Sequence, residues 1–268
     1  MRLIDSHCHL QAGAFVADAA DVLAFARSTG VERVLAPGYD LESSRASIEL
    51  AKSLGVDAAA GIHPHDASDS DRDWAQVAEF AVDPLVVAIG ETGLDYDRGF
   101  SSREAQLANL ERHLRLAADL GKPAILHCRS KPGQRDAQDD LIRLLADYRP
   151  PALLHSFSGP VDYAEEAIAM GLAISFSGLV FRKGEEASAR VAQLIPADRL
   201  LIETDSPYLS PPGAPKRRNE PRYVEITARW LAEQRGEEPD RLGETLVANY
   251  DRVFSRPPTP TDRPQAAP

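Results

Sequence analysis

Eight short apolar segments alternate with amphipathic segments along almost the whole chain. The apolar segments have the length and the bounding Gly or Pro residues of buried strands, and they cover residues 3–9, 31–36, 56–62, 85–89, 123–126, 152–154, 172–176 and 199–202. Helical spacing of apolar residues predicts helices at 18–28, 43–54, 71–81, 101–120, 136–148, 161–170, 185–195, 220–234 and 239–254. Such alternation favours a parallel sheet, because parallel strands need long crossover connections.

The size of the chain selects among parallel α/β folds. It has 268 residues and 43% hydrophobic content, and eight strand–helix units of this length are typical of a (β/α)8 TIM barrel. An open doubly wound sheet is the alternative, but no Gly-x-Gly-x-x-Gly follows the first strand. We predict one α/β barrel domain over residues 1–254 and a proline-rich, disordered tail over 255–268.

The composition of the chain limits where in the cell it can reside and which molecules it can bind. No apolar run approaches the ~20 residues of a membrane span, and the first strand begins too early to leave room for a signal peptide. Cys8 and Cys128 are the only cysteines, which is typical of a reducing compartment. The net charge of −11 disfavours a broad surface for duplex nucleic acid. We expect a cytoplasmic monomer with no membrane partner and no organic cofactor.

Metal-binding residue types gather at the carboxyl ends of the predicted strands, which is where barrel enzymes place their active sites. They are His7, His9, His63, Glu91, His127, His155, Glu203 and Asp205. His7 and His9 stand two apart and therefore share one strand face. His113 falls in the middle of a helix, and we interpret it as a structural or surface residue.

The number of candidate ligands predicts two divalent cations. One would be held by His7, His9, Glu91 and Asp205. The other would be held by His127 and His155, with Glu91 bridging the two. Mixed imidazole and carboxylate ligands suit Zn, Mn, Fe or Ni, with Mg possible where carboxylates dominate. Two such ions ~3.5–4 Å apart stabilise the attacking and leaving oxygens of a phosphoryl displacement and activate a water.

Four residues are candidates for direct roles in the reaction: Glu91, Asp205, Glu203 and His63. Asp205 is placed to hold a proton of the attacking water. Glu203 is two residues away on the same face and either orients a ligand or pairs with an arginine of the barrel. His63 is expected to contact phosphate, to orient a ligand or to ligate a metal, and the sequence does not choose among these roles. Cys8 and Cys128 should point away from the ligands into the core.

Cationic residues follow three of the predicted strands on the same side of the barrel. They are Arg129 and Lys131 after the fifth, Arg182 after the seventh, and Lys216, Arg217 and Arg218 after the eighth. A local basic rim on an acidic chain predicts an anionic phosphate substrate. The alternative for each residue is an ordinary solvated charge.

The chain resembles the TatD-family metal-dependent deoxyribonucleases of the amidohydrolase-like barrel superfamily. The resemblance spans residues 3–254 and rests on Asp5-Ser6-His7-Cys8-His9-Leu10, Gly61-Ile62-His63-Pro64-His65, Gly90-Glu91-Thr92-Gly93-Leu94-Asp95-Tyr96, His127-Cys128-Arg129, His155-Ser156-Phe157-Ser158-Gly159 and Glu203-Thr204-Asp205-Ser206-Pro207. It implies a barrel with two metals on the ligands named above, and 3′-to-5′ hydrolysis of DNA with magnesium or manganese. It also implies assisting roles for His63, Arg129 and Glu203. The insertion Ser130-Lys131-Pro132-Gly133-Gln134 departs from the family pattern.

We therefore predict a divalent-metal-dependent nuclease that acts on single-stranded or frayed DNA, because a site at a barrel mouth is too recessed for intact duplex. The alternative is a metal-dependent amidohydrolase or esterase on the same barrel, including a D-aminoacyl-tRNA deacylase. That superfamily often bridges its metals with a modified lysine at the fourth strand, where this chain has Glu91.

Overall fold

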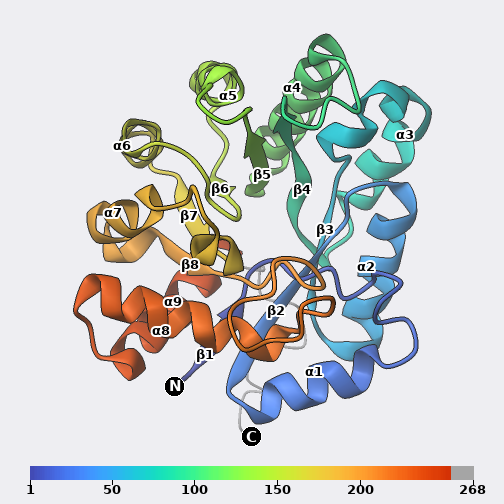
Figure 1. Cartoon of the computed structure of the whole chain (residues 1–268). Coiled ribbons are helices and arrows are strands. Elements are labelled where there is room, and N and C mark those ends of the chain that lie inside the picture. Colours follow the sequence, from blue (N-terminus) through green and yellow to red (C-terminus); the bar gives the residue numbers. More distant parts are fainter. Residues whose placement is uncertain (255–268) are drawn as a thin grey trace, which may run out of the picture.

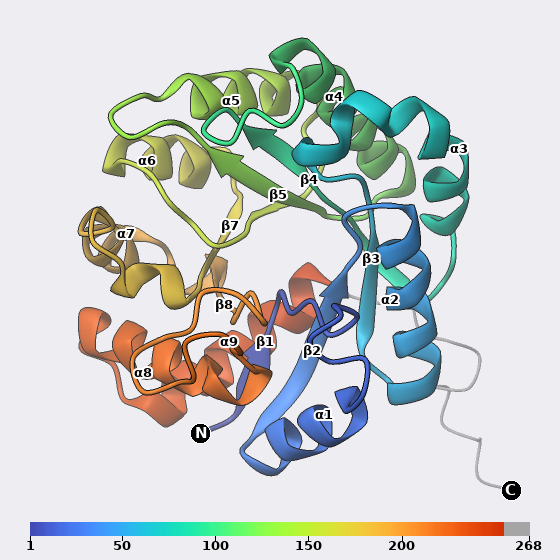
Figure 2. The same ribbon diagram turned by 45° about the vertical axis from the view of Figure 1, so that its right-hand side comes forward.

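The computed structural model describes residues 1–254, and the tail predicted for residues 255–268 lies outside the described residues. The strands form a central ring enclosed by helices (Figures 1 and 2). The strands are β1 (Leu3–Asp5), β2 (Val31–Pro37), β3 (Asp57–Ala60), β4 (Val86–Asp95), β5 (Ala124–Arg129), β6 (Ala152–Leu154), β7 (Ala173–Phe176) and β8 (Leu200–Ile202). The α-helices are α1 (Ala19–Ser28), α2 (Leu41–Leu54), α3 (Ser70–Phe80), α4 (Arg103–Leu120), α5 (Asp136–Tyr148), α6 (Val161–Ala169), α7 (Ala187–Leu194), α8 (Val224–Arg235) and α9 (Pro239–Val253).

The strands form one parallel sheet in sequence order from β1 to β8. The ring is closed by backbone hydrogen bonds just beyond β1 and β8. The amide of Ser6 donates to the carbonyl of Ile202 at 3.0 Å, and the amide of Asp205 donates to the carbonyl of His7 at 2.9 Å. The predicted (β/α)8 barrel is therefore confirmed for residues 1–254, and its closure joins two segments that carry candidate ligands.

The fourth strand differs from its prediction. The sequence pattern places its end at Ile89, because the glycines that follow are typical of a turn, whereas β4 continues to Asp95. Its second half pairs with β5, with Gly93 opposite His127 and Asp95 opposite Arg129. Gly93 has a φ of 142°, and a Cβ there would collide with the carbonyl oxygen of His127. Glycine thus allows β5 to approach β4 closely at a candidate ligand.

The first strand is shorter than its prediction. It ends at Asp5, so His7 and His9 lie on the extended segment after it, where Cys8 forms an isolated parallel bridge with Ser206. The alternation expected for a strand nevertheless persists, since Cys8 is fully buried in the core while His7 and His9 meet on the other side.

Glycine residues and a serine hydroxyl determine where several helices begin and end. Gly55, Gly121 and Gly236 end α2, α4 and α8 in the left-handed conformation. At the start of α4, Ser101 and Glu104 have the spacing of a capping box, but they do not form one. Ser102 caps α4 by accepting from the amide of Ala105, and Ser101 instead donates its hydroxyl to the carbonyl of His65.

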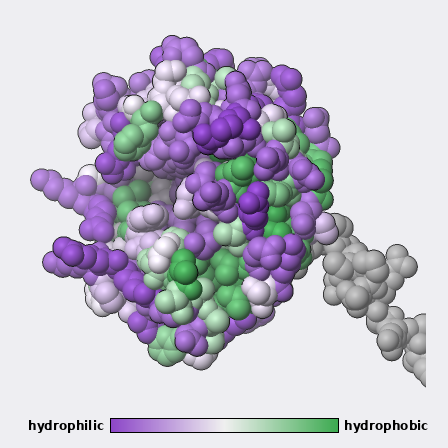
Figure 3. All heavy atoms as spheres, turned by 90° about the vertical axis from the view of Figure 1, so that its right-hand side faces the viewer, coloured by the Kyte–Doolittle hydropathy of each residue, from purple (hydrophilic) through white to green (hydrophobic). Residues whose placement is uncertain are grey.

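One face of the barrel, drawn in Figure 3, is mostly polar. The face in Figure 3 carries predominantly hydrophilic side chains with hydrophobic ones in patches between them. Within residues 1–254, no helix has both the length and the apolar character needed to cross a bilayer.

His113 on α4 is buried, and both of its ring nitrogens are paired. Nε2 accepts from the amide of Ile62 at 3.1 Å, and Nδ1 donates to the carbonyl of Asn109 at 2.7 Å. These bonds require the neutral ring, and burial lowers the pKa of His113 to about 4. The interpretation of His113 as structural is confirmed, and it links α4 to the segment that delivers His63.

The buried, neutral ring of His113 makes the free energy of unfolding depend on pH, and the pKa of the ring gives the direction of that dependence. Because the folded pKa lies below the ordinary value of 6.5, the unfolded chain binds a proton between pH 6.5 and 4 that the folded chain does not, so stability falls as the pH falls. His113→Gln can replace both hydrogen bonds without titrating. We predict that its stability deficit against the wild type shrinks by about 3 kcal/mol from pH 8 to pH 4, as measured by urea unfolding. A constant deficit would contradict the burial argument.

Candidate metal centre

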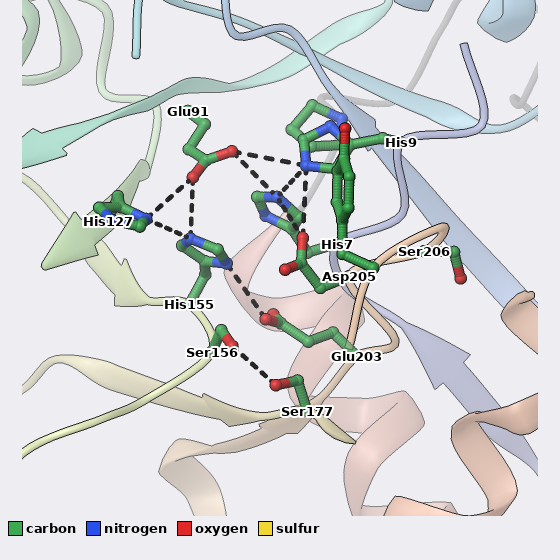
Figure 4. A network of polar contacts seen from close by, with 12 residues as sticks. His7, His9, Glu91, His127, His155, Ser156, Ser177, Glu203, Asp205 and Ser206 are labelled. Carbon is green, nitrogen blue, oxygen red and sulfur yellow. Dashed lines mark hydrogen bonds and ion pairs between the residues drawn. The ribbon is translucent and has the colours of Figure 1, made fainter. Parts of the chain in front are cut away.

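Glu91 lies at the middle of the candidate site, between two groups of side chains (Figure 4). Its carboxylate is 3% exposed, and each oxygen faces a different group. Oε2 is 3.2 Å from Nε2 of His7 and 3.7 Å from Nε2 of His9. Oε1 is 2.9 Å from Nε2 of His155 and 3.3 Å from Nδ1 of His127. This is the arrangement that a bridging carboxylate requires.

The first group combines residues from the two ends of the chain. Nε2 of His7 and Nε2 of His9 are 3.2 Å apart, and Oδ1 of Asp205 lies 3.7 Å and 3.3 Å from them. These three ligand atoms all lie within 4.8 Å of one another. Asp205 has a φ of 56°, a left-handed conformation that a non-glycine residue rarely adopts and that aspartate tolerates better than most.

The second group lies on β5 and just beyond β6. Nδ1 of His127 is 3.3 Å from Nε2 of His155, and both face Oε1 of Glu91. The predicted ligands therefore do converge, with Glu91 between the two groups.

His63 also reaches this second group, with Nε2 at 3.2 Å from Oε1 of Glu91. Its other nitrogen, Nδ1, accepts a hydrogen bond from the amide of His65 at 3.2 Å. Burial lowers the pKa of His63 to about 4, so the ring is neutral and Nε2 carries its only proton. His63, Glu91 and His127 form a group whose ligand atoms are close enough to hold one metal ion, but in this tautomer the protonated Nε2 donates to the Glu91 carboxylate. Of the roles left open by the sequence, the geometry favours a hydrogen-bonding one.

A carboxylate lies behind each histidine of the second group, on the side away from Glu91. Nδ1 of His155 donates to Oε1 of the buried Glu203 at 3.1 Å, which leaves the Nε2 lone pair facing Glu91. Nε2 of His127 lies 3.4 Å from Oδ2 of Asp95, which leaves Nδ1 facing Glu91. A carboxylate behind the imidazole is the arrangement that fixes the ring of a metal-bound histidine. The alternative that Glu203 pairs with a barrel arginine is wrong within residues 1–254, where its ion-pair partner is His155.

The electrostatics of the site are those of a buried anion. Burial alone would raise the pKa of Glu91, but the imidazoles of His155, His63 and His7 hold it well below its ordinary value. The pKa of Asp205 is likewise lowered against the effect of burial, through its hydrogen bond with His9 and the nearby His7. Both carboxylates are therefore ionised at neutral pH.

The donor set fits divalent cations. Within residues 1–254 neither carboxylate forms an ion pair with a lysine or arginine, and their charged partners are imidazoles alone. Burying ionised carboxylates without a cation is costly. Among the described residues, three groups have ligand atoms close enough to hold one ion, namely His7 with Glu91 and His155, His7 with His9 and Asp205, and His63 with Glu91 and His127. Imidazole nitrogens and carboxylate oxygens of this kind are ligands for divalent cations.

Asp5 positions the two chain ends that form the first group, a role that the sequence pattern did not reveal. Its Oδ1 accepts from the amide of Thr204 at 2.9 Å, and its Oδ2 accepts from the hydroxyl of Thr204 at 2.6 Å. Asp5 is fully buried, and burial raises its pKa well above the ordinary value. The alternation of side chains along β1 could have found it, since Asp5, His7 and His9 share one parity.

The cationic residues that follow β5, β7 and β8 differ in their surroundings. Lys131, Lys216 and Arg217 are exposed, and no ion pair involving them occurs in the described part of the chain. Arg182 is exposed and weakly bound to the carbonyl of Ser210 at 3.5 Å. Arg129 pairs with Asp97 at 2.8 Å, with its side chain 46% exposed.

Arg218 differs from these residues. Its guanidinium binds Asp18 at 2.6 Å and Glu220 at 3.1 Å, donates to the carbonyl of Ala14 and lies over the ring of Phe15. Its Nε, Nη1 and Nη2 atoms each bind a protein group, and these contacts favour a structural role for Arg218, which ties the β8–α8 loop to the β1–α1 loop.

Comparison with known proteins places this geometry in a family. The sequence matches the family model described as TatD related DNase over residues 4–255. A curated relative from Cronobacter sakazakii, named 3′-5′ ssDNA/RNA exonuclease TatD, is 39% identical over 266 residues, covering 96% of this chain and 100% of the relative. The protein of the same name from Escherichia coli K12 is 37% identical over 263 residues, covering 94% and 98%.

Solved structures of TatD proteins have the same fold as this chain. A TatD homologue from Escherichia coli K12 superposes with a TM-score of 0.84 at 28% identity, covering 96% of this chain and 99% of the other. A TatD-family hydrolase from Entamoeba histolytica gives a TM-score of 0.85 at 21% identity, covering 96% and 99%, which supports the fold. From the sequence match and the full-length similarity, this chain belongs to the TatD related DNase family.

Proposed function

We propose that this protein is a divalent-metal-dependent nuclease that hydrolyses phosphodiester bonds of single-stranded DNA from the 3′ end. The observation that carries the proposal is the Glu91 carboxylate, whose Oε2 faces the imidazoles of His7 and His9 and whose Oε1 faces those of His127 and His155. The family membership and the names of the curated relatives support the reaction and the substrate.

Two divalent cations, when bound, would supply Lewis-acid stabilisation of the phosphate and lower the pKa of a water nucleophile. The chain's own residues hold and orient the reactants. Asp205, ionised and at the opening of the first ligand group, is placed to accept a proton from the attacking water. The Nε2 proton of His63 faces Oε1 of Glu91, and it is proposed to change partner and donate to a phosphate oxygen when substrate is bound. Arg129, Lys131, Arg182, Lys216 and Arg217 are proposed to attract the phosphate backbone.

Glu203 is proposed as a positioning residue. It is fully buried behind His155, so it cannot touch substrate, and its effect on the reaction passes through the tautomer of that ring.

Three further properties remain predictions. They are the identity of the metal among Mg, Mn, Zn, Fe and Ni, a monomeric state, and the single-domain organisation of residues 1–254. The cytoplasmic location also remains one, with the free thiols of Cys8 and Cys128 in its favour.

The alternative of an amidohydrolase or aminoacyl-tRNA deacylase on the same barrel is not favoured. The relatives from Cronobacter sakazakii and Escherichia coli K12 are named exonucleases, and a glutamate rather than a modified lysine lies between the two ligand groups.

Glu91→Gln tests the bridging role, because the amide keeps the shape but removes the charge and one oxygen ligand. We predict binding of fewer than two Mn²⁺ per chain by elemental analysis and a loss of at least 100-fold in the degradation of a 5′-labelled single strand. The rise in melting temperature produced by Mn²⁺ should shrink as well. Glu233→Gln, an exposed charge on α8, is the matched control and should behave as the wild type. Full metal content and activity in Glu91→Gln would refute the bridge.

Glu203→Gln tests positioning through His155. The amide oxygen can still accept from Nδ1, but without charge assistance, so we predict about 10- to 100-fold weaker binding at one of the two metal sites. Titration of the metal-free protein with Mn²⁺ by calorimetry measures each site. Equal weakening of both sites, or of neither, would argue against a specific link to His155.

Arg217 and Arg218 are sequence neighbours with different expected effects. Arg218→Ala removes ion pairs and a ring contact, and we predict a loss of ~1 kcal/mol in the free energy of unfolding with little change in the salt dependence of strand binding. Arg217→Ala should leave stability unchanged and reduce the slope of log affinity against log salt by about one. Reversed effects would show that the two side chains have been misassigned.

A further inference from the structure

Two exposed aromatic side chains border the metal centre. Phe100, on the loop after β4, is 68% exposed, and Tyr208, on the loop after β8, is 57% exposed. A third exposed ring, Phe25 on α1, is covered by the guanidinium of Arg222 at 4.6 Å. Phe100 and Tyr208 each contact a histidine near the site and leave much of the ring exposed, so each offers a flat apolar surface to a ligand.

The two rings lie at opposite ends of one continuous run of ring contacts that passes through the metal centre. Phe100 contacts His65 with centroids 4.7 Å apart, and Tyr208 contacts His9 with centroids 5.8 Å apart. Between these ends the contacts run in order through His65, His63, His127, His155, His7 and His9. Phe100 is therefore on the side of the Glu91 Oε1 group, and Tyr208 is on the side of the Oε2 group.

The positions of the two rings fit the alternation of phosphates and bases along a single nucleic-acid strand. A phosphate held at Glu91 between the two ligand groups would have one nucleoside on each side. Bases of a single strand are unstacked and can lie on aromatic side chains, and this stacking tolerates any base and either sugar. Paired bases inside a duplex have no free face to offer.

We propose that Phe100 and Tyr208 are base-stacking platforms that hold the 3′-terminal base and its neighbour on either side of the scissile phosphate. The inference rests on the proposed nuclease function and adds the source of its single-strand specificity. The nearby charges are consistent with it, because exposed Lys216 and Arg217 share the β8–α8 loop with Tyr208 and exposed Lys131 follows β5. The rings bind the bases while the cations attract the backbone.

The test uses the full-length protein with Mn²⁺ and an eight-residue oligothymidylate carrying a 5′ label. Phe100→Ala and Tyr208→Ala should each raise KM about 5- to 100-fold, the range expected for one stacked base, with kcat changed much less. Phe100→Tyr and Tyr208→Phe retain a ring and should stay within about twofold of the wild type. Phe100→Leu and Tyr208→Leu retain apolar bulk but should behave like the alanine variants. Phe25→Ala is the control for loss of an exposed ring elsewhere.

Substrates that lack a single base separate stacking from a general structural effect. An oligonucleotide with an abasic 3′-terminal residue should be bound poorly by the wild type and no worse by one of the two alanine variants. An abasic penultimate residue should give the same result with the other variant. Alanine variants with wild-type KM, or with equal losses on intact and abasic strands, would overturn this inference while leaving the nuclease function intact. A wild-type protein that degrades no single strand would instead overturn the proposed function itself.

Discussion

The site depends on one buried carboxylate that faces two sets of ligands. Glu91 could not remain ionised at 3% exposure without the imidazoles around it, since burial acts in the opposite direction on its pKa. Those imidazoles are in turn held by further carboxylates, Glu203 behind His155 and Asp95 near His127. The cluster is thus an arrangement of buried anions and imidazole rings in which neighbouring groups shift one another's pKa. Such an arrangement is costly to bury and is most simply explained by cations at its centre.

The barrel supplies the rigidity that this arrangement needs. Its closure is made at the same place as the first ligand group, because Asp5 binds Thr204 and the amide of Asp205 binds the carbonyl of His7. The same hydrogen bonds therefore close the sheet and hold the ligands in place. This explains why a buried carboxylate as costly as Asp5 is present at a position that touches no substrate.

Two assignments show how local pattern and tertiary contact differ. Arg217 and Arg218 are adjacent and chemically identical, yet Arg218 is bound to Asp18 and Glu220 while Arg217 is exposed. His63 and His155 both follow strands and both face Glu91, yet their ring tautomers are opposite because a backbone amide binds one and a carboxylate binds the other. Neither distinction can be read from the order of residues alone, because the fold brings Asp18 to Arg218 and Glu203 to His155 from distant segments.

The amino-acid sequence by itself determined the number and order of the strands, the end of the barrel that carries the chemistry, and the residues His7, His9, Glu91, His127, His155 and Asp205 as one cluster. These follow from periodicity and from the rule that parallel strands end on one face. Tertiary structure alone decided that β4 continues through its glycines, that Glu91 presents one oxygen to each group, and that Phe100 and Tyr208 border the centre from opposite sides. The physical reason is that strand pairing, carboxylate orientation and ring contacts depend on groups brought together only when the barrel closes.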